Sequence, residues 1–314
     1  MLRPQRGVAL ITAVLVIALA AIVAAAMLSS TNLSIHRAST LSDTERAWWY
    51  ADGIEQWVKS ILTLDQQNSK IDYLGEAWAV PQVVLPVDEG TLRGGIVDLQ
   101  GRFNLNNLGA DEPRFSIYKA QFERLVHNID TLKDTPIDGV AEAIHDWVDS
   151  NDQPMGFGGA EDSEYTTLVP PYRTANRPMT SVSELLAIKG VTKELYLGLR
   201  DYVCALPEQG TKINVNTAPL PVLMSLVDRP NSDLAQFAQS RIEKPADNAQ
   251  TWWSATFPGA GQPGQNAPDV TVQSEYFLLH GEAFIGSSHL ALYSVVRRKS
   301  GSPPAVISRS QDID

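Results

Sequence analysis

The feature that most constrains this chain is an uninterrupted apolar run near its N-terminus. Residues 8–28 read VALITAVLVIALAAIVAAAML, without a charged residue, a proline or a glycine. As an α-helix these residues span roughly 31 Å, about the thickness of the hydrocarbon core of a bilayer. A secretory signal normally has a shorter apolar core, of about 7–15 residues, before a small-residue cleavage site, which Ala24-Ala25-Ala26 resembles. We therefore favour a membrane-spanning helix over a discarded signal peptide.

The helix is expected to continue beyond the membrane. Arg3 and Arg6 precede the run, so the positive-inside rule keeps the N-terminus in the cytoplasm and the chain after about Ser29 outside. Residues 8–52 contain no proline or glycine, and apolar residues then recur at helical spacing. This stripe consists of Ala47, Ala51, Ile54, Val58 and Ile61, flanked by Trp48 and Leu62. We predict one helix over 8–64, roughly 85 Å long, with one apolar face in its second half.

The rest of the chain separates into two strand-rich parts with a helical block between them. Residues 83–108 and 270–299 are rich in β-formers broken by turn residues, and Gly286-Ser287 matches a two-residue hairpin turn. Apolar periodicity predicts short helices over 115–129, from Pro136 to 148, over 180–190 between a Ser181 or Ser183 cap and Gly190, after Thr192, and after Pro219. Residues 305–309 predict a last edge strand. This order indicates an α+β fold with an inserted α-helical domain.

Composition argues against nucleic-acid binding and against catalysis. The net charge is −11, which repels phosphate backbones. The sequence has neither a glycine-rich phosphate loop nor a nucleophile elbow. No two histidines stand at ligand spacing among His36, His127, His145, His280 and His289. The single cysteine, Cys204, lies in a helical pattern and is expected to be a small buried residue. Lys189-Gly190-Val191 resembles the turn of a helix-hairpin-helix, which we expect to serve packing here.

The segment from Asp134 to Tyr172 is strongly acidic. It contains no lysine or arginine, and its carboxylates are Asp134, Asp138, Glu142, Asp146, Asp149, Asp152, Glu161, Asp162 and Glu164. Like charges this dense cost stability unless water or a cation neutralises them, and hard oxygen donors favour Ca²⁺ over zinc or copper. Counted from Asp149, the sixth residue is Pro154 and the twelfth is Ala160, so this is not an EF-hand. From the residues alone, a solvated acidic loop and a Ca²⁺ site both remain open.

Several stretches together resemble the K-type minor pseudopilins of the type II secretion system. Arg6-Gly7 before the apolar run is similar to the class III leader of type IV pilins and pseudopilins. The stretches DLQGRFNLNNL, DWVDSNDQP, GGAEDSEY, PPYRTANRPMTSVSELLAIKGVT and INVNTAP are similar to the K-type family in the same order. Most pilins carry a glutamate at the fifth mature residue, where this chain has Thr12, and the K branch also lacks that glutamate. The resemblance covers nearly the whole chain.

The resemblance implies a pilin-like α+β fold, in which a long N-terminal helix packs on an antiparallel sheet and a large α-helical domain is inserted. It also implies cleavage by prepilin peptidase after Gly7 and methylation of the new N-terminus, Val8. Loss of Arg3 and Arg6 lowers the net charge from −11 to −13. The expected parts are a leader (1–7), a transmembrane segment (8–28), an amphipathic periplasmic helix (29–64), a first β part (65–112), an inserted α-domain (113–256) and a second β part (257–314).

The resemblance further implies one or two structural Ca²⁺ ions, because K-type pseudopilins bind Ca²⁺ in the acidic region. The expected ligands lie in segments 149–152 and 159–165 and in the following turn, and they are Asp149, Asn151, Asp152, Glu161, Asp162, Glu164 and Asn176.

The implied partners are the I- and J-type minor pseudopilins in a tip complex, the major pseudopilin, prepilin peptidase and the bacterial inner membrane. The implied role is in the periplasmic pseudopilus, which is used to export folded proteins across the outer membrane. Two rival functions are a Ca²⁺-dependent single-pass periplasmic scaffold and a membrane-anchored hydrolase.

Overall fold

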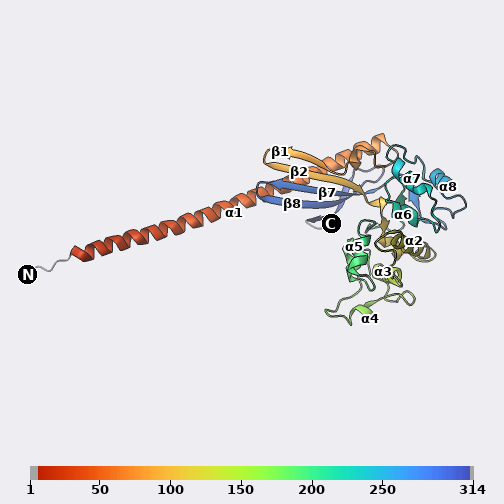
Figure 1. The fold of residues 1–314 in the computed structure, drawn as a ribbon, viewed down its shortest axis with the longest axis horizontal. Helices are drawn as coiled ribbons and strands as arrows, with labels where there is room; N and C mark the ends of the chain where they lie inside the picture. Colours follow the sequence, from red (N-terminus) through yellow and green to blue (C-terminus); the bar gives the residue numbers. More distant parts are fainter. Residues whose placement is uncertain (1–5, 312–314) are drawn as a thin grey trace, which may run out of the picture.

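The computed structural model describes residues 6–311 and consists of a long helix, a sheet and a lobe of short helices (Figure 1). The first half of the long helix projects away from the rest of the chain, and the lobe lies at the end of the sheet distant from the N-terminus. The predicted leader comprises residues 1–7, of which residues 1–5 lie outside the described residues.

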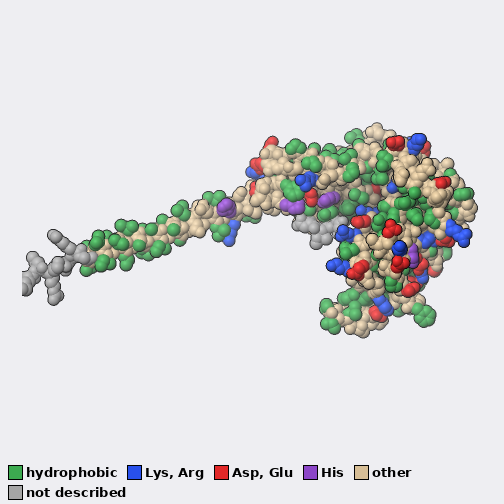
Figure 2. Space-filling view, in the orientation of Figure 1, with side chains coloured by type: hydrophobic (Ala, Val, Ile, Leu, Met, Phe, Trp, Pro, Cys, Tyr) green, Lys and Arg blue, Asp and Glu red, His purple; other side chains and the backbone are tan. Residues whose placement is uncertain are grey.

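The long helix, α1, runs from Arg6 to Asn68 as one element of 63 residues, four residues beyond its predicted end. Its first half is exposed on every side, and Figure 2 shows that this surface is largely apolar. The most apolar part has a mean hydropathy of 3.0, and none of it is buried within the chain. By length and composition, α1 can therefore cross a membrane.

The second half of α1 buries one face against the sheet. Its buried apolar side chains are Ala47, Ala51, Ile54, Val58 and Leu62. The predicted stripe is confirmed except at its end, where Leu62 is buried and Ile61 is only partly buried. Successive steps of four residues place Leu62 on the same face as Ile54 and Val58. Glu55 is also completely buried, which the apolar pattern does not predict.

The sheet has five antiparallel strands in the order β1-β2-β7-β8-β9. They are β1 (Val83–Val87), β2 (Gly90–Asp98), β7 (Tyr276–Ile285), β8 (Ser288–Arg297) and β9 (Ala305–Gln311). The α1 stripe packs with Phe277, Leu279 and Val296 in one hydrophobic cluster. Two strand predictions are confirmed: β7 and β8 form a hairpin in which Ile285 pairs with Ser288, and β9 is an edge strand.

The lobe is built from short helices and two short parallel strand pairs. Its α-helices are α2 (Arg114–Asn128), α3 (Val140–Val148), α4 (Asp162–Tyr165), α5 (Lys193–Leu199), α6 (Leu220–Ser225), α7 (Asp233–Ser240) and α8 (Ala249–Thr256). The strand pairs are β3 (Phe103–Asn104) with β4 (Val203–Cys204), and β5 (Ile213–Asn214) with β6 (Val270–Thr271). The remaining elements are the 3₁₀ helices η1 (Ala77–Ala79), η2 (Leu99–Gly101), η3 (Leu105–Gly109) and η4 (Val182–Ala187).

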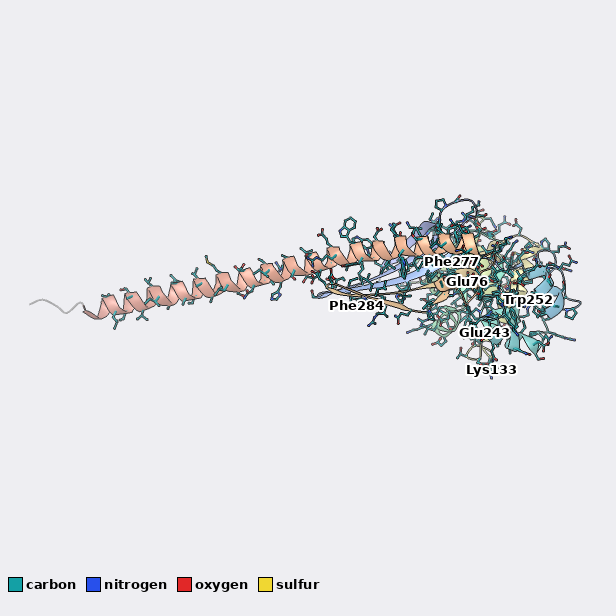
Figure 3. The ribbon with its side chains drawn as sticks, turned by 90° about the horizontal axis from the view of Figure 1, so that it is seen from above. Glu76, Lys133, Glu243, Trp252, Phe277 and Phe284 are labelled. Carbon is teal, nitrogen blue, oxygen red and sulfur yellow. The ribbon has the colours of Figure 1, made fainter. Side chains whose placement is uncertain are left out.

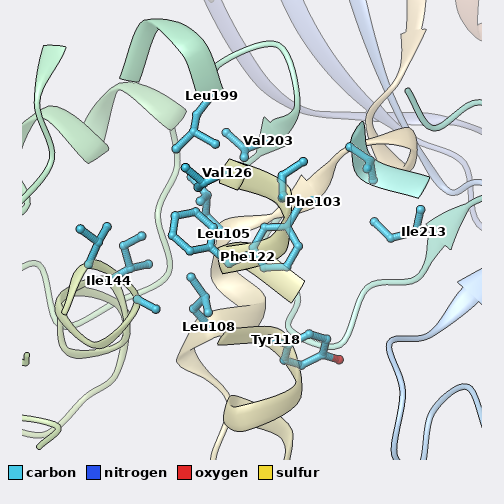
Figure 4. Packing of buried hydrophobic residues seen from close by; sticks show 14 of the residues in the cluster. Phe103, Leu105, Leu108, Tyr118, Phe122, Val126, Ile144, Leu199, Val203 and Ile213 are labelled. Carbon is cyan, nitrogen blue, oxygen red and sulfur yellow. The ribbon is translucent and has the colours of Figure 1, made fainter. Parts of the chain in front are cut away.

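The lobe has its own hydrophobic core, with Phe103, Leu105 and Phe122 fully buried near its centre (Figure 4). The buried members of this core extend from Phe103 to Val270. The core is thus wider than the predicted insertion at 113–256, because η3 and β6 pack with the helices. The division of the chain into domains stays a prediction.

Residues 99–108 differ from the predicted strands. They form η2 and η3 around the two-residue β3. The Asp98 side chain accepts a hydrogen bond from the Gln100 amide, and the Asn104 side chain accepts one from the Asn106 amide. These local caps compete with a strand and start short helical turns instead. The Asn106 side-chain amide in turn donates to the carbonyl oxygens of Met179 and Leu206, so both asparagines bridge backbone groups.

Helix boundaries in the lobe follow their caps. The helix predicted from Pro136 begins only at Val140, because Gly139 before it has a φ of +78° and breaks the helical conformation. At η4, the capping residue is Ser181, in a capping box with Glu184. The predicted start at Thr192 is confirmed, since its hydroxyl accepts from the Leu195 amide.

Cys204 is buried as predicted, but it lies in β4 rather than in a helix. Burial raises the pKa of its thiol to about 12. The thiol donates to the Leu99 carbonyl oxygen at 3.3 Å, which fits a structural rather than a reactive side chain.

Buried polar side chains join the lobe to the sheet. Asp98, at the end of β2, accepts hydrogen bonds from the hydroxyls of Thr217 and Ser274, both at 2.6 Å, and from the Asn214 amide at 3.0 Å. Asn214 and Thr217 belong to the lobe, whereas Ser274 precedes β7. Arg298, after β8, forms an ion pair with the buried Asp72. This network fixes how the lobe sits on the sheet.

Candidate functional site

The acidic side chains of the lobe gather where α3 ends. Asp146 is completely buried and was not among the predicted ligands. Its carboxylate accepts from the backbone amides of Met155, at 2.9 Å, and Ala160, at 2.7 Å. Burial raises the pKa of Asp146 above its ordinary value, although these hydrogen bonds oppose the shift. Asp146 therefore folds the following loop back over the end of α3.

Asp149 lies one turn further along, at the C-cap of α3. One of its carboxylate oxygens lies 3.3 Å from Nε2 of His145, whose Nδ1 lies 2.7 Å from the Leu108 carbonyl oxygen. His145, Asp146 and Asp149 each have one potential metal-ligating atom that lies within 4.8 Å of those of the other two. Burial raises the pKa of Asp149, which the neighbouring His145 opposes.

Two acceptor atoms in this region are buried without a donor among the described residues. They are Oε1 of Glu161 and Oδ1 of Asn176. The other Glu161 oxygen accepts from the Thr174 hydroxyl at 3.2 Å, and the Asn176 amide donates to Asp152 at 2.8 Å. Asn176 has a φ of +46°, an uncommon conformation outside glycine. Buried acceptors without donors suit a bound cation.

The charges around Glu161 identify which carboxylates share this region. Burial is the first cause that raises the pKa of Glu161 to about 7, and the charges of Asp146, Asp149 and Asp152 raise it further. The carboxylates of segment 149–152 thus act on Glu161 through their charges. A cation bound here would favour the ionised carboxylates that burial and mutual repulsion now disfavour.

The other predicted ligands have protein partners. Asp162 accepts from the Thr174 amide at 3.0 Å, and Glu164 forms an ion pair with Lys189 at 3.1 Å. Asn151 is exposed and uses its oxygen to accept from the Gln153 amide. Among the described residues, Asp152 thus contacts Asn176 directly, whereas the ligand atoms of Asp149 group with those of His145 and Asp146 and not with those of Asp152 and Glu161. Burial of Asp146 was missed, because it stands two residues from both Ile144 and Val148 and therefore on the side of the predicted helix opposite their apolar face.

At the other end of the molecule, the predicted processing residues lie at the start of α1. Val8 is 66% exposed in the first apolar turns. The Thr12 hydroxyl donates within the helix, to the carbonyl oxygens of Val8 at 3.1 Å and Ala9 at 3.0 Å. Gly7 is helical, and its surroundings are not described. Thr12 is therefore satisfied inside its own helix.

The fold defines the pilin-like class of subunit, in which the N-terminal half of a long helix is exposed and apolar and the other half packs on an antiparallel sheet. A family model described as "Type II secretion system (T2SS), protein K" matches residues 101–208. The type II secretion system protein K of Aeromonas hydrophila is 32% identical over 323 residues, covering 98% of this chain and 97% of its own length. That of Pseudomonas aeruginosa is 32% identical over 318 residues, covering 98% and 93%. The chain belongs to the type II secretion system protein K family.

The fold has a solved counterpart. A chain in the crystal structure of the GspK-GspI-GspJ complex from enterotoxigenic Escherichia coli superposes with a TM-score of 0.76 and 24% sequence identity. The match covers 88% of this chain and 100% of that chain. It confirms the predicted α+β fold, with a long N-terminal helix, an antiparallel sheet and additional helices.

Proposed function

We propose that the chain, a minor pseudopilin of the type II secretion system, is held in the inner membrane by residues 8–28 and later moves into the tip of the periplasmic pseudopilus. The observation that carries this proposal is the wholly unburied apolar half of α1. Such a surface requires lipid or the apolar helices of partner subunits. One segment can serve both states, because a helix satisfies its own backbone hydrogen bonds in either setting.

The helical lobe supports a place at the end of the filament. It lies at the end of the sheet opposite the apolar half of α1 (Figure 1), where a further subunit would stack. A lobe of this size obstructs such stacking, so the subunit is best accommodated at the tip. The related GspK occurs in a complex with GspI and GspJ. We infer I- and J-type minor pseudopilins as partners, with the major pseudopilin below.

Processing after Gly7 gives the sharpest test of this function. Prepilin peptidase would remove residues 1–7 and methylate Val8, and Arg3 and Arg6 would keep the uncleaved N-terminus cytoplasmic. Mass spectrometry of the chain purified from membranes should find an N-terminus at methylated Val8. A chain that keeps Met1 would instead be an uncleaved anchor, which contradicts the proposal and favours the scaffold.

Thr12 fits a subunit with no neighbour above it. In a filament, the glutamate at this position is thought to pair with the free N-terminal amine of an adjacent subunit. The Thr12 hydroxyl is already satisfied by Val8 and Ala9, so a tip subunit loses little without the glutamate. Thr12→Glu should leave secretion nearly unchanged, and complete loss of secretion would count against the tip position.

We further propose that the lobe binds one or two structural Ca²⁺ ions. Asp149, Asp152 and Glu161 would supply carboxylate oxygens, and Asn176 a neutral amide oxygen. The unpartnered oxygens of Glu161 and Asn176 support this ligand set. The role would be structural, because the ion ties together two loops that bury few apolar side chains. The chain would thus act as a subunit rather than as an enzyme.

Thermal melting of the full-length chain in detergent micelles tests the ion. Ca²⁺ that binds only the folded state adds about 2.7 kcal/mol at a hundredfold excess over Kd. We expect EGTA to lower the melting temperature, and to have little further effect on an Asp149→Ala, Glu161→Ala double variant. Glu243→Gln, an exposed site in the lobe, is the matched control and should respond like the unmodified chain. Identical curves in Ca²⁺ and EGTA would leave the segment a solvated acidic loop.

A further inference from the structure

A cleft separates the lobe from the outer side of the sheet. Residues of β7 alternate, so Phe277 points toward α1 whereas Phe284 lies on the opposite, outer side (Figure 3). Leu278 shares the outer side with Phe284, and it lies opposite Val295 of β8. This outer side forms the floor of the cleft, which has a volume of about 460 Å³. Such a volume is within the range of ligand pockets, roughly 300–1,000 Å³.

The lobe and the edge of the sheet form the two sides of this cleft. On the lobe side, α5 contributes Tyr196, and Figure 1 shows α5 below the sheet. On the sheet side, Ser308 and Ser310 of β9 line the cleft, and both pair with β8 residues of its floor. The lining therefore combines an apolar floor with polar groups at its sides, which distinguishes it from a purely apolar surface.

Two arginines without ion pairs give the cleft a positive charge. Arg102 and Arg200 both line it, and neither forms an ion pair with a carboxylate among residues 6–311. By contrast, Arg297 and Arg298 at the end of β8 are both paired with carboxylates. Asp201 is the one acidic residue in the lining. The lining thus has two positive charges and one negative charge, in a chain whose net charge is −11.

The charge of Arg102 acts on the interior of the cleft. Burial raises the pKa of the Cys204 thiol to about 12, and the charge of Arg102 opposes this shift. Cys204 also lines the cleft. Arg102 is partly buried, whereas Arg200, at the C-cap of α5, is exposed. A partly buried guanidinium without a carboxylate attracts an anion more strongly than one in bulk water, because water and salt screen it less.

β9 offers an unpaired edge beside these charges. It is the last strand of the sheet, and among the described residues it pairs with β8 alone. Its residues 307–311 are exposed. An exposed edge strand can accept a further extended segment through backbone hydrogen bonds. Because side chains alternate along a strand, every second side chain of such a segment would lie on the same side as Ser308 and Ser310 and face the cleft.

We propose that an extended segment of another protein, with aspartate or glutamate at alternate positions, adds to β9 and places its carboxylates in this cleft. Arg102 and Arg200 would bind the carboxylates, because a guanidinium can donate two parallel hydrogen bonds to one carboxylate. Asp201 and the acidic surface of the chain disfavour nucleic acids and other dense polyanions. The cleft is separate from the apolar half of α1, so this partner binds in addition to the subunits proposed above to pack along that helix.

Fluorescence anisotropy with a labelled peptide tests this site on the full-length chain in micelles of a non-ionic detergent. The probe is a short peptide of alternating threonine and glutamate, and the reference peptide has glutamine in place of each glutamate. At low salt we expect the glutamate peptide to bind about tenfold more tightly or better. Arg102→Gln and Arg200→Gln should each weaken its binding by about threefold or more. Arg229→Gln is the matched control, because Arg229 is exposed between α6 and α7, outside the cleft, and it should bind like the unmodified chain.

Two further peptides test the pairing with β9 and do not depend on any variant. They carry N-methyl groups on the backbone amides of either the threonines or the glutamates. Alternate amides of a strand point to opposite sides, so one of these two peptides should lose most of its affinity. Retained binding by both would overturn the strand addition. Equal binding of the glutamate and glutamine peptides, or full binding by both arginine variants, would overturn the site itself. Circular dichroism of each variant establishes that it is folded.

Discussion

The contact between Glu55 and Arg309 predicts how the edge strand β9 is held against α1. Glu55 is completely buried in α1, and its carboxylate accepts two hydrogen bonds from the Arg309 guanidinium, both at 2.7 Å. The Ser294 hydroxyl donates a third at 3.1 Å. Burial raises the pKa of Glu55, but the hydrogen bonds and charge of Arg309 outweigh it and hold the pKa below its usual value. Glu55 is therefore ionised and depends on Arg309.

Replacing Arg309 with methionine leaves the buried carboxylate without its main partner. Removing one member of a buried ion pair costs about 3–5 kcal/mol, and we reduce this to about 2–3 kcal/mol because water reaches the half-exposed Arg309. At about 2–4 °C per kcal/mol, the melting temperature should fall by about 4–12 °C. Lys59→Met is the control, because Lys59 lies 3.8 Å from Glu55, and it should cost less than about 1 kcal/mol.

The pH dependence separates this cause from a simple loss of packing. A carboxyl group whose pKa is lowered in the folded state stabilises the fold above its unfolded pKa, here 4.5, and this contribution disappears as the pH falls through the folded pKa. The difference between Arg309→Met and the unmodified chain should therefore be full at pH 7 and shrink toward pH 4. Hydrogen exchange should also become faster in β9. An equal difference at both pH values would refute the role of the charge.

Three further results are expected. Asp98→Asn should lower the free energy of unfolding by about 2–4 kcal/mol in denaturant titrations, because the new amide would point a donor at groups that now donate hydrogen bonds to Asp98. The control Asp88→Asn, in the exposed β1–β2 turn, should change the free energy of unfolding by less than about 0.5 kcal/mol. Ala18→Arg should cost about 2.5–3.5 kcal/mol of membrane insertion, and normal extraction and assembly of this variant would contradict the spanning helix. Cys204 should resist thiol reagents in the native chain and react only after unfolding, so rapid native labelling would contradict its burial.

Elements governed by neighbouring residues were predictable from the sequence. The apolar period defines α1 and its buried face, and the Gly286-Ser287 turn defines the β7–β8 hairpin. Prediction failed where side-chain caps compete with periodicity. Asp98 and Asn104 bind backbone amides two residues ahead and convert expected strand into 3₁₀ turns. The alternation of apolar residues carries no information about such caps.

Contacts between distant residues were not predictable. Glu55 and Arg309 are separated by 254 positions, and the stripe analysis placed no buried charge on α1. In the acidic loops, the sequence indicated the segments and the type of donor. Which oxygens remain without partners depends on tertiary folding.

The exposed stretch of α1 between its apolar run and its first contact with the sheet also determines how far the folded part stands from the membrane. Residues 29–39 are exposed, and the first contact of α1 with the β7–β8 hairpin is at Thr40, whose carbonyl oxygen accepts from the Ser288 hydroxyl. With residues 8–28 upright in a bilayer, this stretch raises the near end of the sheet about 17 Å above the hydrocarbon core. The folded part then cannot touch the headgroups unless the helix tilts steeply. A change in bilayer thickness would therefore change the height and the tilt of the sheet and the lobe relative to the membrane, because α1 is one continuous helix.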